Sequence, residues 1–352
     1  MPDATRNDRP ESDSPQAEPA RAGGPGCPLP GASPRETALA TAALPATALP
    51  AAALPAAEPK AFLSPPEIAA AFVESGARKA GLGAGKLLLL GLLAGAFIAF
   101  ASEGSSMAAF NLLARPETYG LGRALAGAIF GTGLMLVVVA GGELFTGNVL
   151  ILLSVLERRT RLAAMLRNWL LVYAGNLAGS LLVACMMARS GLFDSGASVL
   201  GGMTIKIASR KTALHFEEAF YLGVMCNWLV CLAVWMATAA KDVAGKLLAV
   251  FFPIWLFITS GFEHSVANMY YVPAGILAKA NASWAGAALA LGVGPEKLAA
   301  LDWGSFAFRN LLPVTLGNIA GGGLFVAFAY WLAYLRGGGN SGKGGEGGAA
   351  RP

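Results

Sequence analysis

Long apolar stretches recur six times along the chain, and each is long enough for a membrane-spanning helix. A helix needs about 20 residues to cross roughly 30 Å of hydrocarbon. The stretches cover residues 86–110, 121–156, 162–188, 217–240, 247–280 and 305–335. The second and fifth are too long for one span, and glycine and polar residues interrupt both of them. The pattern therefore predicts an all-α membrane protein with six transmembrane helices, the second and fifth broken at mid-membrane.

The two interruptions repeat each other. Residues 141–148 read GGELFTGN and residues 261–268 read GFEHSVAN, with glycine, glutamate and asparagine at corresponding positions. A second echo follows, because residues 167–182 share a spaced set of residues with 309–324. The first helix of each half shows no such echo. Three spans per half is an odd number, so the sequence predicts an inverted 3+3 repeat, and matched Gly-interrupted segments indicate a translocation site at mid-membrane.

The two ends of the chain differ from the transmembrane region, residues 81–336. Residues 1–60 are rich in Ala and Pro, and we expect them to be disordered. No run of seven apolar residues follows a basic start there, which argues against a secretory signal. Residues 64–80 are expected to form an amphipathic helix in the membrane interface, because Ser64 and Glu67 make a capping box around Pro65. The Gly-rich residues 337–352 predict a flexible tail.

Composition and charge agree with a membrane protein. Of the 352 residues, 55% are hydrophobic and 13% are charged, which leaves too few polar residues to cover a soluble surface. Six spans place both termini on one side of the membrane. Dense basic residues in the short links near 158–161 and 241–246 favour the cytoplasmic side of the inner membrane, although the opposite links hold a similar number. The net charge of +5 gives no sign of nucleic-acid binding.

Patterns for catalysis or cofactor binding are missing from the sequence. The four cysteines form no CxxC or Cys/His spacing, so we expect no metal site. There is no phosphate-binding loop, no GxSxG sequence and no cluster of histidines and carboxylates for hydrolysis. We therefore predict that the protein is not an enzyme and carries no cofactor.

His264 lies inside the second interruption, next to Glu263. A buried histidine is often only a hydrogen-bonded core residue, but the interrupted helix and its matching partner favour a pore-lining role. Ionisable groups that are retained at membrane depth tend to line a pathway. Imidazole suits such a pathway because small changes in its surroundings move its protonation across working pH.

Polar residues at equivalent positions of the two interruptions are expected to support the unwound backbone. Glu143 and Glu263 share one repeat position, which argues against both being proton carriers. We expect each carboxylate to accept hydrogen bonds from backbone N–H groups freed by unwinding, since these cannot stay unpaired in lipid. Asn148 and Asn268 are expected to do similar work. The Thr146 hydroxyl either holds the loop or faces the substrate, and the sequence leaves both open.

Three segments in this order and spacing resemble the formate/nitrite transporter family: GGELFTGN, GVMCNWLVCLAVWMA at residues 223–237, and GFEHSVANMY. The likeness covers about residues 64–336 and implies an aquaporin-like fold, assembled as a pentamer with one pore in each protomer. It implies that His264 is the central pore histidine and that Asn227 and Thr146 lie beside it. The family's vestibular lysine corresponds to Lys211, which is otherwise interpreted as an interfacial cation with a snorkelling side chain.

The resemblance also implies apolar constrictions at Phe130, Leu134, Leu144 and Phe257. Phe130 and Leu134 are four residues apart and share one helix face, so from the sequence alone they are ordinary packing residues. An apolar ring excludes bare ions because an isolated charge in a low dielectric is costly. Lys211 and helix N-termini at the breaks would draw in a small anion by their positive potential.

These observations predict a pathway for small monovalent anions of weak acids. The anion gains a proton at or near His264, either from the imidazolium or from water that His264 holds, and crosses the constrictions as the neutral acid. We favour formate as the substrate, with nitrite and hydrosulfide as alternatives of the same class. A water or glycerol channel would share the broken-helix fold, whereas a membrane scaffold or enzyme lacks support. The expected partners are the anion, protons, membrane lipid and further copies of the chain.

Overall fold

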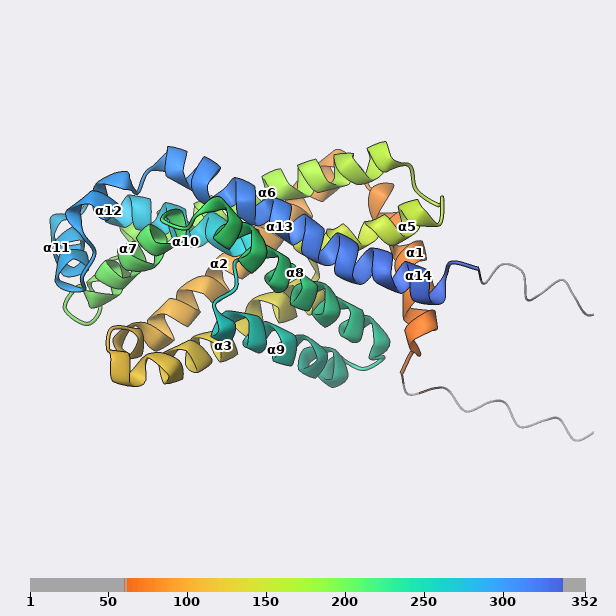
Figure 1. Cartoon of the computed structure of the whole chain (residues 1–352), viewed down its shortest axis with the longest axis horizontal. Helices are drawn as coiled ribbons and strands as arrows, with labels where there is room; N and C mark the ends of the chain where they lie inside the picture. Colours follow the sequence, from red (N-terminus) through yellow and green to blue (C-terminus); the bar gives the residue numbers. More distant parts are fainter. Residues whose placement is uncertain (1–59, 61, 338–352) are drawn as a thin grey trace, which may run out of the picture. The chain divides into compact units, whose positions relative to one another are not determined.

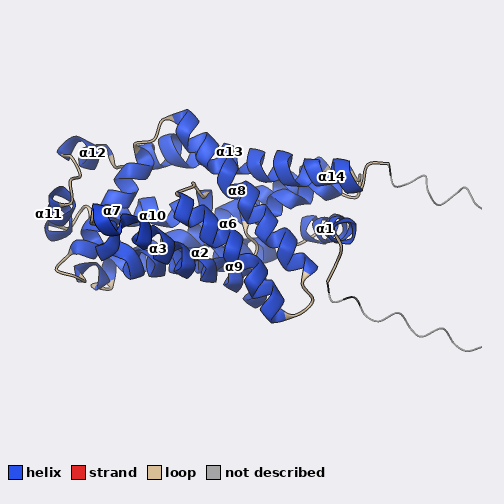
Figure 2. Ribbon diagram, turned by 60° about the horizontal axis from the view of Figure 1, so that its bottom comes forward, coloured by secondary structure: helices blue, strands red, loops and turns tan. Residues whose placement is uncertain are grey.

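The computed structural model describes residue 60 and residues 62–337, and regular structure within them is helical (Figure 2). The predicted tails, residues 1–60 and 337–352, lie almost wholly outside the described residues. Six helices in the described part are long and apolar enough to cross a membrane. They are Ala84–Leu113, Pro116–Gly141, Leu162–Arg189, Phe216–Ala239, Val243–Ser260 and Ser305–Tyr334. The prediction of an all-α protein with six spans is therefore confirmed.

The spans correspond to labelled helices in Figure 1. The first is α2 (Ala84–Leu113), and the second is α3 (Tyr119–Leu136) with a π-helical turn, η2 (Val137–Gly141). The third to fifth are α6 (Leu162–Arg189), α8 (Phe216–Ala239) and α9 (Val243–Ser260). The sixth is built from η5 (Ser305–Leu311), α13 (Leu312–Gly322), η6 (Gly323–Phe328) and α14 (Ala329–Tyr334).

Both helices that were predicted to be broken are interrupted at the predicted places. After residues 142–144 the first one resumes as α4 (Phe145–Asn148), η3 (Val149–Ile151) and α5 (Leu152–Leu156). The second stops at Ser260 and resumes as α10 (Ser265–Ala278). Gly141 and Gly261 have φ of +93° and +86°, a left-handed conformation that glycine adopts without steric cost. The repeated glycine therefore has the same local role in both breaks.

The helix α1 (Pro65–Ala80) precedes the first span. The backbone N–H of Ser64 donates to the Glu67 carboxylate at 2.8 Å, the bond that the capping box predicts for Glu67, and the Ser64 hydroxyl donates to the same carboxylate at 2.6 Å. The apolar face of α1 packs onto the protein, where Phe72 stacks on Trp235 of α8 with ring centroids 5.3 Å apart. This packing brings α1 next to the first break.

Paired glycines bring two pairs of spans into close backbone contact. A Cβ atom added at Gly179 of α6 would lie 1.9 Å from the carbonyl oxygen of Leu92 on α2. One added at Gly321 of α13 would lie 2.2 Å from that of Val224 on α8. Small residues allow membrane helices to approach this closely. The glycines repeated after each break therefore allow α6 to pack closely against α2 and α13 to pack closely against α8.

Three shorter helices occupy links for which the sequence predicted no element: α7 (Val199–Thr212), α11 (Ala282–Ala290) and α12 (Pro295–Ala300). At 14 residues, α7 is too short for a span, so the search for apolar runs missed it. It packs against α10 and α11 and carries Arg210 and Lys211. The predicted vestibular lysine therefore sits on a helix beside the second break (Figure 1).

Candidate functional site

The two breaks meet at His264. Its Nδ1 accepts the backbone N–H of Ala267 at 3.0 Å, which caps the start of α10. Its Nε2 lies 2.9 Å from the hydroxyl oxygen of Thr146, which α4 supplies from the other break. Because Nδ1 is an acceptor, a neutral ring carries its proton on Nε2 and donates it to Thr146. The ring is 3% exposed, so this hydrogen bond is shielded from water.

Asn227 of α8 completes the central group that the sequence predicted. Its Nδ2 donates to the carbonyl oxygens of Thr146 and Asn318, at 3.2 and 2.7 Å. Its Oδ1 is buried without a partner among the residues that the structure describes. The Thr146 carbonyl is thus held by Asn227 while its hydroxyl bonds His264, and whether the hydroxyl also meets the substrate stays a prediction.

The predicted constriction residues are all buried. The rings of Phe130 and Phe257 pack edge to face with centroids 5.7 Å apart, and Phe257 lies 5.9 Å from the His264 ring. Leu134 and Leu144 line a cavity beyond them. Phe257 therefore lies directly beside the imidazole, with Phe130 packed against it. Leu134 lies one turn after Phe130 on α3, and Leu144 lies in the first break.

Cavities lie at two ends of the spans. Two of them, of about 240 and 260 Å³, share Tyr119, Arg123, Arg210, Lys211, Gly261 and Glu263, and together we name them the arginine vestibule. A third, of about 370 Å³, contains Lys79, Glu143, Leu134 and Leu144 and is named the Lys79 vestibule. On α2, Ser105 lines the first and Leu90 the second, which at 1.5 Å per residue separates them by about 22 Å. Phe130 lies on α3 between Arg123 and Leu134, so the aromatic pair separates the vestibules.

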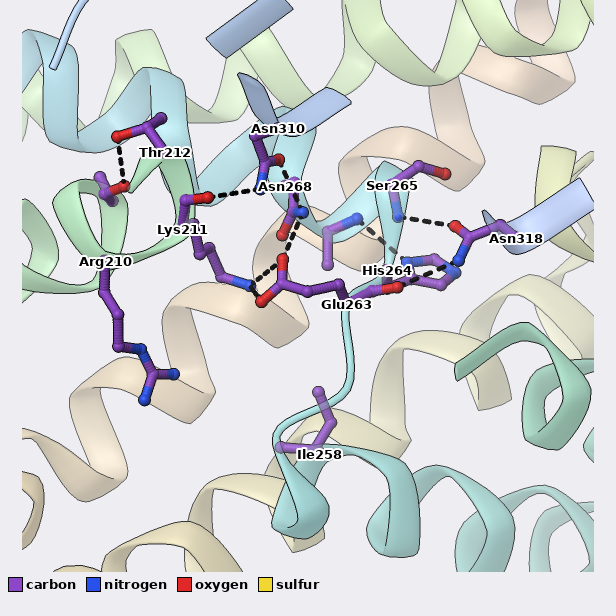
Figure 3. Close-up of polar contacts among 12 residues, drawn as sticks. Arg210, Lys211, Thr212, Ile258, Glu263, His264, Ser265, Asn268, Asn310 and Asn318 are labelled. Atoms are coloured by element: carbon purple, nitrogen blue, oxygen red, sulfur yellow. Dashed lines mark hydrogen bonds and ion pairs between the residues drawn. The ribbon is translucent and has the colours of Figure 1, made fainter. Parts of the chain in front are cut away.

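A buried ion pair holds the second break (Figure 3). Lys211 Nζ lies 2.8 and 3.0 Å from the two carboxylate oxygens of Glu263. Asn268 donates to Glu263 at 2.7 Å and to Asn310 Oδ1 at 2.8 Å, and Asn310 donates to the Lys211 carbonyl at 3.0 Å. Glu263 therefore neutralises the charge of Lys211, so Lys211 alone does not supply the positive potential that was expected to attract the anion.

The first break repeats this network with residues from the first half. Lys79 of α1 pairs with Glu143 at 3.0 Å, and Asn148 donates to Glu143 at 2.7 Å. Asn148 also donates to Asn168 at 2.9 Å, and Asn168 donates to the Lys79 carbonyl at 3.0 Å. The sequence reasoning did not identify Lys79 as a site residue.

A sequence signal for Lys79 exists in the helices that precede the first span of each half, α1 in the first half and α7 in the second. Lys79 precedes Lys211 by 132 positions, the same offset that relates Leu90 to Leu222. The backbone N–H groups of Glu143 and Glu263 donate to the carbonyls of Leu90 and Leu222, at 3.1 and 3.2 Å. The duplication thus extends to the first helix of each half, where the matches are too sparse to be evident by themselves.

The expectation that both glutamates bind freed backbone N–H groups is wrong in its partners. Within the described residues their carboxylates bond lysine and asparagine side chains, and two other asparagines bind the backbone instead. Asn176 accepts from Phe145 N–H at 2.9 Å and donates to the Gly91 and Glu143 carbonyls at 2.8 and 2.9 Å. An amide side chain can both accept and donate, which a carboxylate cannot.

Asn318 performs the same function in the second half. It accepts from Ser265 N–H at 2.9 Å and donates to the Glu263 carbonyl at 3.0 Å (Figure 3). It also donates to the Gly223 carbonyl at 2.8 Å. The sequence signal for both asparagines was present in the second echo, where Gly175–Asn176 matches Gly317–Asn318.

Comparison with known proteins agrees with this architecture. A family model described as formate/nitrite transporter matches residues 66–332. A probable formate transporter of Methanothermobacter thermautotrophicus is 38% identical over 290 residues, covering 78% of this chain and 98% of the relative. The formate channel FocA of Escherichia coli (strain K12) is 37% identical over 281 residues, covering 79% and 96%.

A solved structure described as a pentameric formate channel with formate bound is 39% identical, with a TM-score of 0.63. The match covers 72% of this chain and 98% of that one. The resemblance found in the three sequence segments and the aquaporin-like fold expected from it are therefore confirmed. The described residues contain no group of three or more His, Cys, Asp or Glu side chains placed to hold a metal ion. By sequence, by fold and by its relatives, the chain belongs to the formate/nitrite transporter family.

Proposed function

We propose that this integral membrane protein moves formate together with a proton across the inner membrane, with both termini on the cytoplasmic side. The observation that carries the proposal is the hydrogen bond between His264 and Thr146, buried between two vestibules and beside two phenylalanines. The names of the relatives support formate as the anion. Nitrite has the same charge and two oxygens on one centre, so it is the second candidate within the family.

The mechanism follows from the cost of moving a charge through the apolar centre. A bare formate ion between Phe130 and Phe257 would lose its hydration without gaining a partner. At His264 the Nε2–H group donates to Thr146, and the Thr146 hydroxyl proton is then free to point at an arriving carboxylate oxygen. The Thr146 hydroxyl donates this hydrogen bond to formate, and formate takes up its proton from water of the adjoining vestibule. His264 and Thr146 keep their own protons, and the neutral acid crosses the phenylalanines. The proton leaves the acid in the opposite vestibule, so one anion and one proton cross together.

His264→Phe tests the proposal in proteoliposomes. Phenylalanine keeps an aromatic ring but has no nitrogen to bond the Thr146 hydroxyl and orient it towards formate, so formate-driven change of internal pH should be abolished. His215→Phe is the matched control, because His215 is the other histidine and is exposed at the start of α8. Undiminished pH-dependent formate flux in the His264 variant would rule out the role. Size-exclusion chromatography in detergent checks that both variants assemble normally.

A further inference from the structure

The two vestibules differ sharply in charge. One carboxylate and five cations line the arginine vestibule: Glu263 with Arg115, Arg123, Lys206, Arg210 and Lys211. Five positive charges and one negative charge give a formal charge of +4. The Lys79 vestibule is lined by one cation and one carboxylate, Lys79 and Glu143, so its formal charge is zero. An anion is therefore concentrated at the arginine vestibule and not at the opposite one.

Three of the five cations line both cavities of the arginine vestibule, and one of these is already matched. Lys211 is ion-paired with Glu263. The other two are Arg123 and Arg210, and neither has a carboxylate within 4.0 Å in the part of the chain that the structure describes. These two guanidinium groups are therefore the source of uncompensated charge nearest the second break.

Neutral acceptors hold both guanidinium groups in place. Arg123 Nε donates to the Thr259 carbonyl at 3.3 Å, and Nη2 donates to the Ile258 carbonyl, at the end of α9. Arg210 Nη1 donates to the Tyr119 hydroxyl at 2.9 Å. Tyr119 precedes Arg123 by one turn of α3, so the two arginines approach the cavity from α3 and α7. Figure 3 shows Arg210 extending beside Lys211 without a contact to the other residues drawn.

A guanidinium group presents parallel N–H donors that match two oxygens on one centre, whereas an ammonium group acts as a point charge. We propose that Arg123 and Arg210 form a binding site for carboxylate-class anions in the arginine vestibule, occupied before the anion reaches His264. The inference rests on the proposed function and names the feature that favours two-oxygen anions. Formate and nitrite fit the site, while hydrosulfide offers a single sulfur and gains only from the charge.

Concentration-dependent flux into proteoliposomes, measured for formate and for hydrosulfide, tests the site. Arg210→Lys keeps the charge and loses the fork, so the formate concentration for half-maximal flux should rise about fivefold while that for hydrosulfide stays within about twofold. Arg210→Gln loses the charge as well and should raise the half-maximal concentrations of both formate and hydrosulfide. Arg189→Gln is the matched control, because Arg189 ends α6 and lines neither vestibule.

Arg123 is the second residue to substitute in this test. Its hydrogen bonds to the end of α9 also support the second break, so it is changed only to lysine. Arg123→Lys should raise the half-maximal formate concentration in the same direction as Arg210→Lys. The decisive quantity is the half-maximal concentration for formate divided by that for hydrosulfide. If this ratio is the same in the unchanged protein and in both lysine variants, the proposed binding site is rejected. That result would leave a role for His264 intact, because His264→Phe changes proton coupling and not this ratio.

Chemical modification tests anion binding at the two arginines independently of transport. Phenylglyoxal reacts with accessible arginines, and Arg210 is exposed. Formate should slow modification of Arg210 at least about threefold relative to equal chloride, as read by peptide mass spectrometry, while Arg189 is not protected. Protection without formate flux would support the site and reject the proposed function. Equal modification rates in formate and chloride would reject the site whether or not flux is seen.

Discussion

At the scale of single residues, each break keeps one lysine–glutamate pair, and the two pairs differ in their exposure to water. The side chains of Lys211 and Glu263 are 10% and 4% exposed, and those of Lys79 and Glu143 are 33% and 9% exposed. Removing one partner of a buried pair leaves a charge without compensation, which costs far more than the pair gains by forming. The pair at the second break should therefore be the more sensitive one.

Lys211→Met should lower the free energy of unfolding by about 3–5 kcal/mol, because Glu263 is left charged and buried. Lys79→Met should cost less, since water reaches Lys79 and screens its partner. Adding Glu263→Gln to the Lys211 variant should recover much of the loss. Thermal unfolding in detergent measures all three variants, and an unchanged midpoint for Lys211→Met alone would contradict the prediction.

At the scale of elements, the glycine contacts and the helix caps decide how the spans start and cross. The crossing of α13 and α8 brings Gly321 against the Val224 carbonyl, and that of α6 and α2 brings Gly179 against Leu92. These are backbone contacts, so a new methyl group cannot be accommodated by a change of rotamer. The spans would have to move apart, which also shifts the asparagines that support the breaks.

Gly321→Ala should destabilise the protein by about 1–3 kcal/mol through this overpacking. Gly286→Ala is the matched control, because Gly286 lies in α11 and a Cβ there meets nothing within 4 Å. The control should be neutral or slightly stabilising, as alanine favours a helix over glycine. The denaturation midpoints of the two variants are compared. Equal effects would show that α13 and α8 have room for a methyl group at Gly321, against the prediction.

The start of α1 should depend on pH. Lys60, followed by Ser64, lowers the pKa of the Glu67 carboxyl from 4.5 to about 2. A depressed pKa stabilises the folded helix start above pH 4.5, and that contribution is lost as pH falls towards 2. Hydrogen exchange at the first amides of α1, relative to those of α6, should therefore speed up between pH 5 and 2. In Glu67→Gln the same ratio should not change with pH.

The elements show which features could be predicted from the sequence and which could not. Apolar run length predicts the six spans, and the repeated glycine at 141 and 261 predicts both breaks because few residues tolerate their left-handed backbone. The short helix α7 was missed, since its 14 residues carry charge and form no long apolar run. The partners of Glu143 and Glu263 were wrong because a sequence shows what a side chain can bond, and not which donor the fold brings to it.

At the scale of the whole molecule, the chain is one of several copies if it assembles like the pentameric relative whose structure is known. Each copy of the chain contains His264 and both vestibules. The structure brings His264, Thr146 and Asn227 together, and their role in transport stays a prediction. The opposite vestibule was not predicted, because Lys79 lies outside the six spans.

We expect a pentamer of about 180 kDa, five times the 36.0 kDa of the chain, in native mass spectrometry from detergent. Bound lipid would add to this mass, so a denatured sample provides the reference for the single chain. A dominant mass of one, two or three chains under several mild detergents would contradict the expected assembly.

The six hydrogen bonds of Asn176 and Asn318 tie both breaks to α2 and α8 through buried amides. A transport cycle that moved the breaks away from these spans would have to break the six hydrogen bonds at every turnover. The buried polar groups would then have no hydrogen-bond partner. The passage is therefore expected to keep one shape while it conducts. The transport rate would then be set by diffusion of the neutral acid between Phe130 and Phe257. Cooling should lower this rate only as much as it lowers diffusion through a channel of fixed shape.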